Sequence, residues 1–280
     1  MSCLHSPRQG PVAATVEVAG ARVRVTASDR TDTMVLVEPI NEASRSDVKV
    51  AGKTKVDFTG GQLSVKTTTP GDKRGSVAIT IDLPAGSSLA AYLAHSSVQA
   101  DGPIGQCELH LASGQVRLDR IDALQASIAS GEVAIGWIAG RADIDGGAFA
   151  VRIGEVRGTV GLWSSGGHAW IGHASTDLDL SSGRGDFDID RADGSITATT
   201  GNGAIRIGRM THGQAKLTNG SGNIEVGISE GTAASIDANS ERGAVHDFVS
   251  SQENADQSDH KVMVHARTRH GDIIIQRAAS

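Results

Sequence analysis

The sequence predicts an all-β protein: a parallel β-helix, or β-solenoid, with about 16–21 residues per coil, preceded by a short N-terminal β segment. Glycine returns at a nearly constant interval from Gly114 onward, and apolar residues alternate with polar ones after each of these glycines. The 280 residues include 35 glycines but only three tryptophans, one tyrosine and four phenylalanines. A core with so few large rings must be thin, which suits stacked strands.

The first 90 residues differ from the rest of the chain. Residues 1–11 are expected to form a flexible tail, and residues 12–90 an N-terminal β segment that caps the solenoid, because an uncovered end exposes unpaired strand edges. VEVAGARVRVTAS and TMVLVEPI alternate as strands do, and KVDFTGGQLSVKT predicts a hairpin through Gly60 and Gly61. VAITIDLPAG predicts a further strand that stops at Pro84.

Residues 91–280 are predicted to contain the solenoid repeats. The repeated segments are GQVRLDRI, GEVAIGWI, GAFAVRIG, GHAWIGHA, GDFDIDRA, GAIRIGRM, GNIEVGIS, GAVHDF and GDIIIQRA. Their first glycines are 17, 16, 20, 18, 18, 19, 21 and 28 residues apart, which is the signature of a repeat architecture. The polar run at 250–260 is expected to be a mobile loop and accounts for the last and longest interval.

Each coil is expected to hold two short strands and two tight turns. Alternation points Ile205 and Ile207 inward in one coil and Ile224 and Val226 inward in the next. Turns such as TTGNG and TNGSG return the chain, and glycine supplies their positive-φ corners. One coil cannot bury its apolar face alone, so coils must stack about 4.8 Å apart. An antiparallel sandwich also has short strands and glycine turns, but it does not require apolar positions to stay in phase over successive units.

Several phrases carry a resemblance to a known family. They are SDRTDTMVLVEP, VDFTGGQLSVK, IDLPAGSS, the SG-D/N-I repeats and HARTRHGDIIIQR. Over about residues 12–277 the chain resembles the bacterial β-strand-repeat proteins of the "putative adhesin" family, a domain of unknown function, and in particular its actinobacterial, signal-less type. The resemblance implies a β-solenoid with no established catalytic residues.

Charge and composition restrict the class of partner and the compartment. The formal net charge is -6 with both signs interspersed, and nucleic-acid binding calls for a basic stripe, so we expect no nucleic-acid partner. We see no apolar run of signal-peptide length and no 18-residue apolar stretch, so we expect no membrane span and a cytoplasmic protein. Cys3 and Cys107 are too few for a disulfide framework.

No motif in the sequence predicts catalysis, a cofactor or a metal site. GKT at 52–54 ends like a phosphate loop, but Asp47 stands where its first glycine is needed, which favours a charged turn. The zinc-protease helix, the nucleophile elbow and the Cys-x-x-Cys pair are missing. His260, His265 and His270 recur at an odd spacing, so neighbours on a strand face opposite sides and do not converge on a metal.

The candidate partner-binding residues are outward-facing rings and acids. They are Trp163, Trp170, His168, Asp177, Asp179, Asp186 and Asp188. Two large rings on a solvent face suggest a contact surface, and packing against small neighbours such as Gly161 and Ala150 is the alternative. Trp137 is expected to pack at a turn.

The aspartates of this set are predicted to lie on strands. RGDFDID resembles one unit of the calcium-binding nonapeptide solenoid, but it occurs once and its acids are not in turns. Outward charge that opposes strand aggregation is the favoured interpretation.

The expected function is a non-catalytic scaffold or binding protein that presents a rigid outward face to a protein partner or a polysaccharide. A self-assembling structural solenoid is the first alternative. A carbohydrate-active, lyase-like β-helix enzyme is the second, and it is disfavoured because short turns leave no deep cleft.

Overall fold

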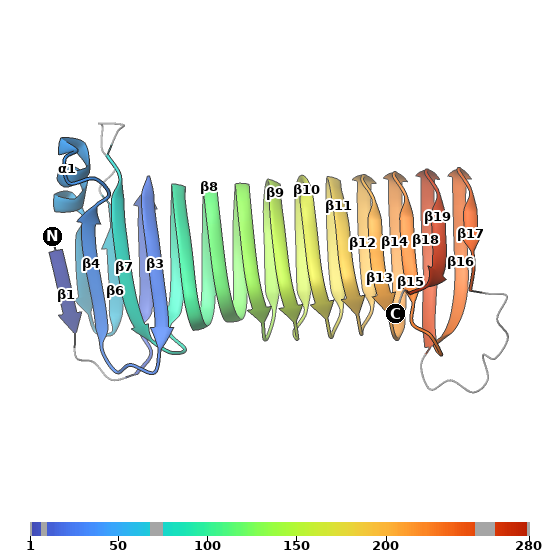
Figure 1. Ribbon diagram of the computed structural model, residues 1–280, viewed down its shortest axis with the longest axis horizontal. Helices are drawn as coiled ribbons and strands as arrows, with labels where there is room; N and C mark the ends of the chain where they lie inside the picture. The colour runs from blue at the N-terminus through green and yellow to red at the C-terminus, as the bar shows by residue number, and fades with distance from the viewer. Residues whose placement is uncertain (1, 7–9, 68–74, 250–260, 279–280) are drawn as a thin grey trace. The chain divides into compact units, whose positions relative to one another are not determined.

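The computed structural model describes residues 2–6, 10–67, 75–249 and 261–278. These residues are mostly β and form a large, mostly parallel sheet with one short helix (Figure 1). They divide into two compact units, Met1–Ala139 and Gly140–Ser280. The domain boundary predicted at 90/91 falls inside strand β8 (Ser88–Ile138), and the loop predicted at 250–260 lies outside the described residues.

The repeat is most regular at the start of the second unit. The strands there are β9 (Ala142–Val156), β10 (Val160–Ala174), β11 (Leu178–Ala192), β12 (Ile196–Asn202), β13 (Ile205–Met210), β14 (Gly213–Ser221) and β15 (Ile224–Ile228). Val160 pairs in parallel with Ala142 on one side and with Leu178 on the other, each 18 residues away. We use the word rung for one such pass of the chain, which is a single strand up to β11 and then a pair, β12 with β13 and β14 with β15.

Each rung bends at a corner and buries apolar side chains from both sides of the bend. In β10, Leu162 before the corner and Ile171 after it are buried, and Gly167 at the corner has φ +114°. Leu162 lines the same narrow internal space as the rings of Phe149 and Phe187, which follow the corners of neighbouring rungs. The two halves of a rung therefore face each other across one core, in which each buried Ile or Leu contributes about 1.5–3 kcal/mol.

Buried polar side chains complete the corners of this core. The residues at this place in successive rungs are Ser182, Thr200, Asn219 and Thr268. Asn219 Nδ2 donates to the carbonyl oxygens of Gly203 and Gly222, at 3.0 and 2.9 Å. Such bonds satisfy corner carbonyls that would otherwise lose a partner on burial, so the turn phrases SSG, TTGNG and TNGSG have a specific structural role.

The glycine that opens each repeat is required by close stacking. Gly222 has φ +131°, and a Cβ atom there would lie 2.2 Å from the carbonyl oxygen of Gly203. A side chain does not fit because parallel rungs about 4.8 Å apart place one corner directly on the next.

The final rung along the chain is not the final rung in space. The remaining strands are β16 (Ala233–Arg242), β17 (Val245–Asp247), β18 (Lys261–His270) and β19 (Ile273–Arg277). β18 lies parallel between β14 and β16, and β19 lies parallel between β15 and β17 (Figure 1). The rungs therefore do not stack in chain order here, because residues 261–277 lie between residues 213–228 and residues 233–247.

The first unit has the same arrangement at its first rung. Its strands before β8 are β1 (Ser2–Ser6), β2 (Ala13–Ala19), β3 (Ala21–Ser28), β4 (Thr33–Pro39), β5 (Lys55–Thr59), β6 (Gln62–Lys66) and β7 (Val77–Pro84). β2 lies parallel between β6 and β8, and β3 lies parallel between β7 and β8. Hydrogen bonds from Val12 N to Ser87 Oγ and from Ala21 N to Ser96 Oγ, at 3.0 and 3.1 Å, bridge 75 positions of sequence.

Antiparallel strands end both ladders of the first unit. β4 pairs antiparallel with β7, β1 pairs antiparallel with β4, and β5 pairs antiparallel with β6. The predicted hairpin is confirmed, with Gly60 and Gly61 both at positive φ. The predicted flexible tail is wrong for Ser2–Ser6, because the backbone of these residues joins β4.

One helix, α1 (Arg45–Lys53), was not predicted. Ser44 caps its N-terminus by accepting a hydrogen bond from Asp47 N at 3.3 Å, and the helix packs against β4 and β7. The stretch that resembles a phosphate loop is therefore the end of a helix, whereas a phosphate loop must open one.

Candidate functional site

The predicted binding residues do not form one site. Trp163 and Asp179 precede the corner of their rungs, whereas His168 and Trp170 follow it, as do Asp186 and Asp188. Because both halves of a rung point inward to the same core, their outward side chains point away from it in different directions. Asp177 lies in the turn before β11, which corrects the expectation that it lies on a strand.

After the corner, outward side chains pair diagonally across neighbouring rungs. His168 Nε2 and Asp188 Oδ2 are 2.8 Å apart, and Trp170 Nε1 donates to Asp190 Oδ1 at 3.2 Å. Both pairs join residues 20 positions apart, which is the 18-residue rung interval plus two. Histidine and tryptophan at alternate positions of one strand thus meet aspartates at alternate positions of the next.

Trp170 is covered from the other side as well. The guanidinium of Arg152, on the preceding rung, lies 4.6 Å from the centroid of the Trp170 ring. The ring also lies over Gly172 of its own strand, where a Cβ atom would be 3.0 Å from it. Cation–π contact of this kind contributes about 0.5–1 kcal/mol at an exposed site. Trp170 is therefore half-buried and held in one orientation.

Asp193 extends this row of pairs. It accepts from Thr211 Oγ1 at 2.6 Å and from Arg191, and its Oδ2 lies 2.8 Å from His173 Nε2. Partial burial acts to raise the pKa of Asp193, but the hydrogen bonds from Thr211, Arg191 and His173 lower it to about 2. The alternation of apolar and polar residues predicts that Asp193 lies beyond the end of its strand, so the sequence gave no reason to predict this cluster.

Before the corner, Trp163 lies on a different surface. It is 43% exposed, and its ring lies back over Gly161, where a Cβ atom would be 2.4 Å from the ring. The alternative that the sequence left open, packing over this glycine, is the arrangement found for Trp163. In the first unit Trp137 is half-buried, with the guanidinium of Arg120 5.5 Å from its ring centroid.

Two of the predicted acidic residues accept hydrogen bonds from backbone amides of the next rung and are not free in solvent. Asp177 Oδ1 accepts from Ser195 N and Asp186 Oδ1 accepts from Ala204 N, both at 2.8 Å. Each bond spans 18 residues, so the carboxylate fixes the turn of the next rung.

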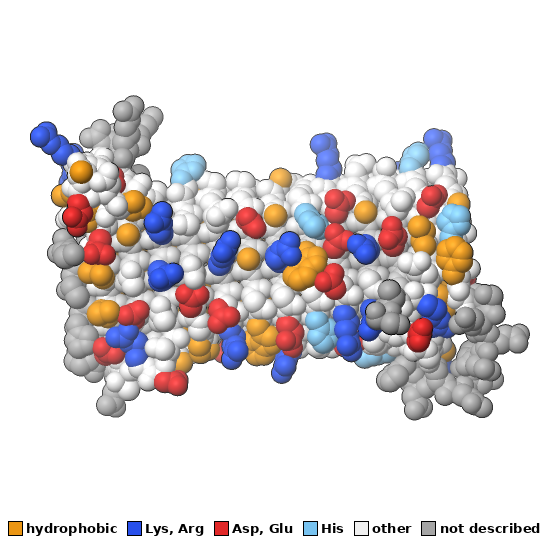
Figure 2. Space-filling model, viewed as in Figure 1, with side chains coloured by type: hydrophobic (Ala, Val, Ile, Leu, Met, Phe, Trp, Pro, Cys, Tyr) orange, Lys and Arg blue, Asp and Glu red, His pale blue; other side chains and the backbone are white. Residues whose placement is uncertain are grey.

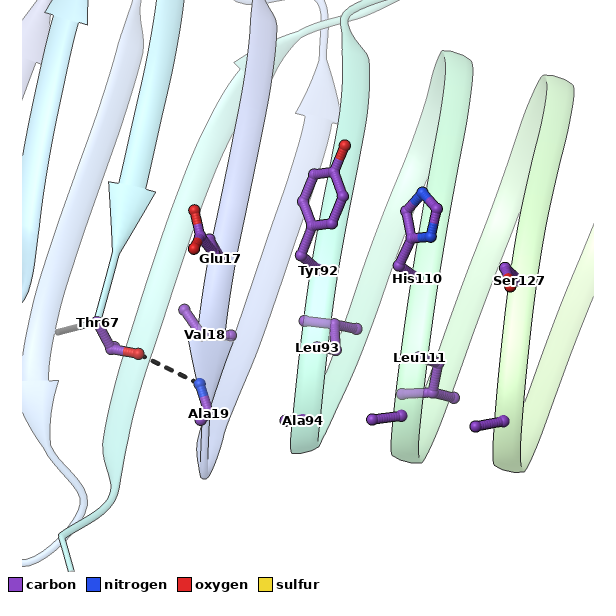
Figure 3. A pocket seen from close by; sticks show the side chains of 12 residues that line it. Glu17, Val18, Ala19, Thr67, Tyr92, Leu93, Ala94, His110, Leu111 and Ser127 are labelled. Atoms are coloured by element: carbon purple, nitrogen blue, oxygen red, sulfur yellow. Dashed lines mark hydrogen bonds between the residues drawn. The ribbon is translucent and has the colours of Figure 1, made fainter. Parts of the chain in front are cut away.

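A shallow groove on the first unit was missed in the sequence. Its volume is about 420 Å³, and outward alanines contribute to its lining together with Glu17, Tyr92, His110 and Ser127 (Figure 3). These alanines are Ala19, Ala94, Ala112 and Ala129. One small residue per rung leaves a trough that runs across the strands.

Stacked rings form one wall of this groove. The Tyr92 and His110 rings have centroids 4.8 Å apart and planes 3° apart. Tyr92 Oη donates to Glu108 Oε1 at 2.9 Å, and His110 Nε2 lies 2.8 Å from the same oxygen. The hydrogen bonds from His110 and Tyr92 lower the pKa of Glu108, and the bond to Glu108 raises the pKa of Tyr92. The 18-residue interval between Tyr92 and His110 equals one rung, and this interval was the signal in the sequence from which the stack could have been predicted.

His95 lies next to Ala94, beside this groove, in a strained backbone conformation. Its φ is +50°, and it stands at the corner where the neighbouring rung has Gly20 at φ +67°. Its Nδ1 lies 2.7 Å from Ser113 Oγ. A left-handed residue other than glycine costs about 1–3 kcal/mol, which the surrounding structure must offset.

Comparison with known proteins identifies the family. A family model described as Toastrack DUF4097 matches residues 13–276. The chain belongs to the DUF4097 toastrack family. No curated protein matches this toastrack chain.

Solved structures similar to the toastrack chain include three described as adhesion proteins. A "putative adhesin" from Parabacteroides merdae is 10% identical with a TM-score of 0.40, over 99% of this chain and 96% of that chain. A "putative adhesin" from Bacteroides fragilis is 9% identical with a TM-score of 0.35, over 98% and 96%. A "putative cell adhesion protein" from Clostridium sporogenes is 10% identical with a TM-score of 0.21, over 99% and 99%.

The described part of the toastrack chain holds no group of three or more His, Cys, Asp or Glu residues placed to bind a metal ion. None of its described helices is long and apolar enough to cross a bilayer. Burial raises the pKa of the Cys107 thiol to about 12, so this buried side chain stays protonated and unreactive at neutral pH. Acidic and basic side chains are interspersed on the visible face of each unit (Figure 2).

Proposed function

We propose that the chain is a non-catalytic binding protein whose two units are β-solenoids with about 16–21 residues per coil, and that it presents a rigid outward face to a protein or polysaccharide partner. The observation that carries this proposal is the diagonal pairing after the corner. His168–Asp188 and Trp170–Asp190 hold a histidine, a tryptophan and two acids in fixed positions before any partner arrives. Pre-organised side chains lose little entropy on binding, which favours recognition.

Arg152 adds a cation to this row of side chains. It lies against Trp170, and both residues stand in register with Asp188. Aromatic and arginine side chains are the residues that most often dominate binding energy at protein interfaces. The row therefore offers a cation, a ring and carboxylates on three successive rungs.

The test compares two tryptophans on different surfaces. Tagged wild-type protein, Trp170→Ala and the matched control Trp163→Ala are used to capture partners from an extract of the source cells. We expect a partner that Trp163→Ala retains and Trp170→Ala loses by at least tenfold. Equal capture by all three proteins would reject the Trp170 face as the binding surface.

Self-assembly is the first alternative, and the outer rung of the second unit argues against its end-to-end form. Asp247 pairs with Ile275, so a carboxylate stands where the neighbouring rung has a buried isoleucine. Inward-facing charge on an edge strand opposes edge-to-edge pairing. Sedimentation over a range of protein concentrations tests this alternative, which requires species larger than a monomer.

A lyase-like enzyme is the second alternative. The groove of the first unit is shallow. A lyase needs a base and a charge-stabilising group on either side of a bound sugar, and the Nδ1 atom of His95, the candidate base beside this groove, already contacts Ser113. Release of unsaturated products from a panel of acidic polysaccharides would establish this activity and overturn the non-catalytic proposal.

A further inference from the structure

One row of outward side chains along the groove of the first unit contains two stacked rings, and the next rung has no ring at the same place. Glu17, Tyr92, His110 and Ser127 occupy this row on successive rungs (Figure 3). Glu17 stands beside Tyr92, with its Oε2 2.8 Å from Lys66 Nζ, and the other face of Tyr92 stacks on His110. Beyond His110 the row continues with the short side chain of Ser127.

The interval between rungs shows that Ser127 is the neighbour of His110. A Cβ atom on Gly131 would meet the backbone of Gly114, which places residues 17 positions apart side by side. The same interval leads from His110 to Ser127. One face of the imidazole is covered by Tyr92, and the other looks over a hydroxymethyl group into the groove.

We propose that the place over Ser127 binds one flat aromatic ring that carries a polar hydrogen on its edge, of the phenol or indole type, stacked on the open face of His110. Stacked rings prefer centroid separations of about 4.5–7 Å, which a ring one rung above His110 satisfies. The row already holds one such pair at 4.8 Å with nearly parallel planes, so the incoming ring continues an existing geometry.

The neighbouring polar groups suit a ring with a donor. Tyr92 directs its hydroxyl to Glu108 Oε1, two positions before His110. The residue equivalent to Glu108 on the next rung is Gln125, which carries an amide oxygen able to accept a hydrogen bond from a phenol or indole. The hydroxyl of Ser127 supplies a second acceptor beneath the ring.

The ring can come from two sources, a free aromatic compound or the side chain of an extended peptide. The trough floored by Ala94, Ala112 and Ala129 leads away from the ring position and has room for a narrow chain. Both sources share the stacked ring, and the test separates them.

The first experiment uses the full chain and follows the imidazole signals of His110 by NMR. N-acetyl-tyrosinamide is titrated, with N-acetyl-leucinamide as the aliphatic control, and the peptide Ala-Ala-Tyr-Ala-Ala forms the second arm. We expect ring-current shifts of the His110 signals with the tyrosine compounds alone, and an affinity in about the millimolar range. Tighter binding of the peptide, by tenfold or more, assigns the ring to a peptide; equal binding assigns it to a free compound.

Two variants make the proposal falsifiable. Ser127→Tyr supplies the missing ring from the chain itself, so it should abolish binding of the probe while circular dichroism stays unchanged. The matched control Gln115→Tyr adds the same ring at an exposed position past the corner at Gly114 and should bind like wild type. Binding to the two His110 variants is followed through the signals of the probe: His110→Ala should weaken it at least tenfold, and His110→Phe should restore it. Unshifted His110 signals at probe saturation, or wild-type binding by Ser127→Tyr, would overturn the proposal.

Discussion

The first rung of one unit and the last rung of the other are placed by the same rule and covered in different ways. In the first unit, residues 13–28 lie between β6–β7 and β8. In the second, residues 261–277 lie between β14–β15 and β16–β17. In both cases the rung formed by the terminal segment is not the outermost one. A rung whose residues are nearer the middle of the sequence stacks outside it.

The two outer rungs differ in what lies on them. β7 is covered by antiparallel β4, and its inward side chains Val77, Ile79 and Ile81 are at most 1% exposed. β16 holds no buried residue, and beside it Val245 is 41% and Phe248 58% exposed. An antiparallel cover thus extends the core by one full rung, whereas an outer rung of small and charged residues ends the core one rung earlier.

The sharpest test of this difference is the same substitution on both outer rungs. Ile79→Ala should destabilise the first unit by about 3 kcal/mol, because it leaves a cavity in a closed core. Ile236→Ala should cost less than about 1 kcal/mol, because that half-exposed side chain has less contact to lose. Urea unfolding of the two variants measures both values, and equal losses would show that the cover has no energetic role.

The second test removes the charge from the outer rung of the second unit. Asp247→Val gives β17 the kind of inward side chain that Ile275 has on its neighbour. We expect concentration-dependent self-association in sedimentation, with a dissociation constant in about the micromolar range. Asp247→Asn keeps the position polar and should stay monomeric; a monomeric Asp247→Val would mean that the carboxylate does not protect this edge.

The third test concerns Asp193, whose hydrogen bonds link neighbouring rungs away from the outer rungs. The pKa of Asp193 is about 2 in the folded chain and lies below its ordinary value, so the ionised carboxylate stabilises the fold at neutral pH. This contribution, about 1 kcal/mol after allowance for solvent screening, is lost as the pH falls from about 4 to about 2. Stability of wild type and Asp193→Asn as a function of pH measures it, and the difference between them should shrink across that window.

The smallest effect is expected for the tie between the two outermost rungs of the second unit. Asp237 on β16 accepts from Arg267 Nη2 at 2.6 and 2.7 Å and lies 2.8 Å from His265 Nδ1. Asp237→Asn should speed amide exchange in β16 without moving the unfolding midpoint, because edge strands open locally. Unchanged exchange in β16 would show that the strand is held by its backbone ladder alone.

Local patterns in the sequence predicted most of the strands and the direction of their side chains, but not β1, which falls in the segment expected to be a tail. Ile205 lies directly beside Ile224 in parallel, as the repeated phrase requires. The order of the rungs was not predictable in this way, because every repeat carries the same alternation and none specifies its neighbour. α1 was also missed, since a helix of nine residues with Gly52 in its last turn has a weak periodic signal.

The candidate sites were predictable only as far as single side chains. Alternation correctly placed Trp163 and Trp170 outward, but it did not show that the corner at Gly166 and Gly167 puts them on different surfaces. The diagonal pairs and the Tyr92–His110 stack depend on which residues stand side by side across rungs, and that requires the register.

The tucked position of residues 261–277 has a consequence for biosynthesis. As the chain leaves the ribosome, β16 is available before β18, and β14 offers it the same free edge and the same spacing of inward side chains. We therefore expect β16 to pair first with β14, in a kinetic trap that must dissolve before β18 can enter. A pause in translation ahead of residue 261 would lengthen the life of this trapped species, and rapid delivery of the remaining residues would shorten it.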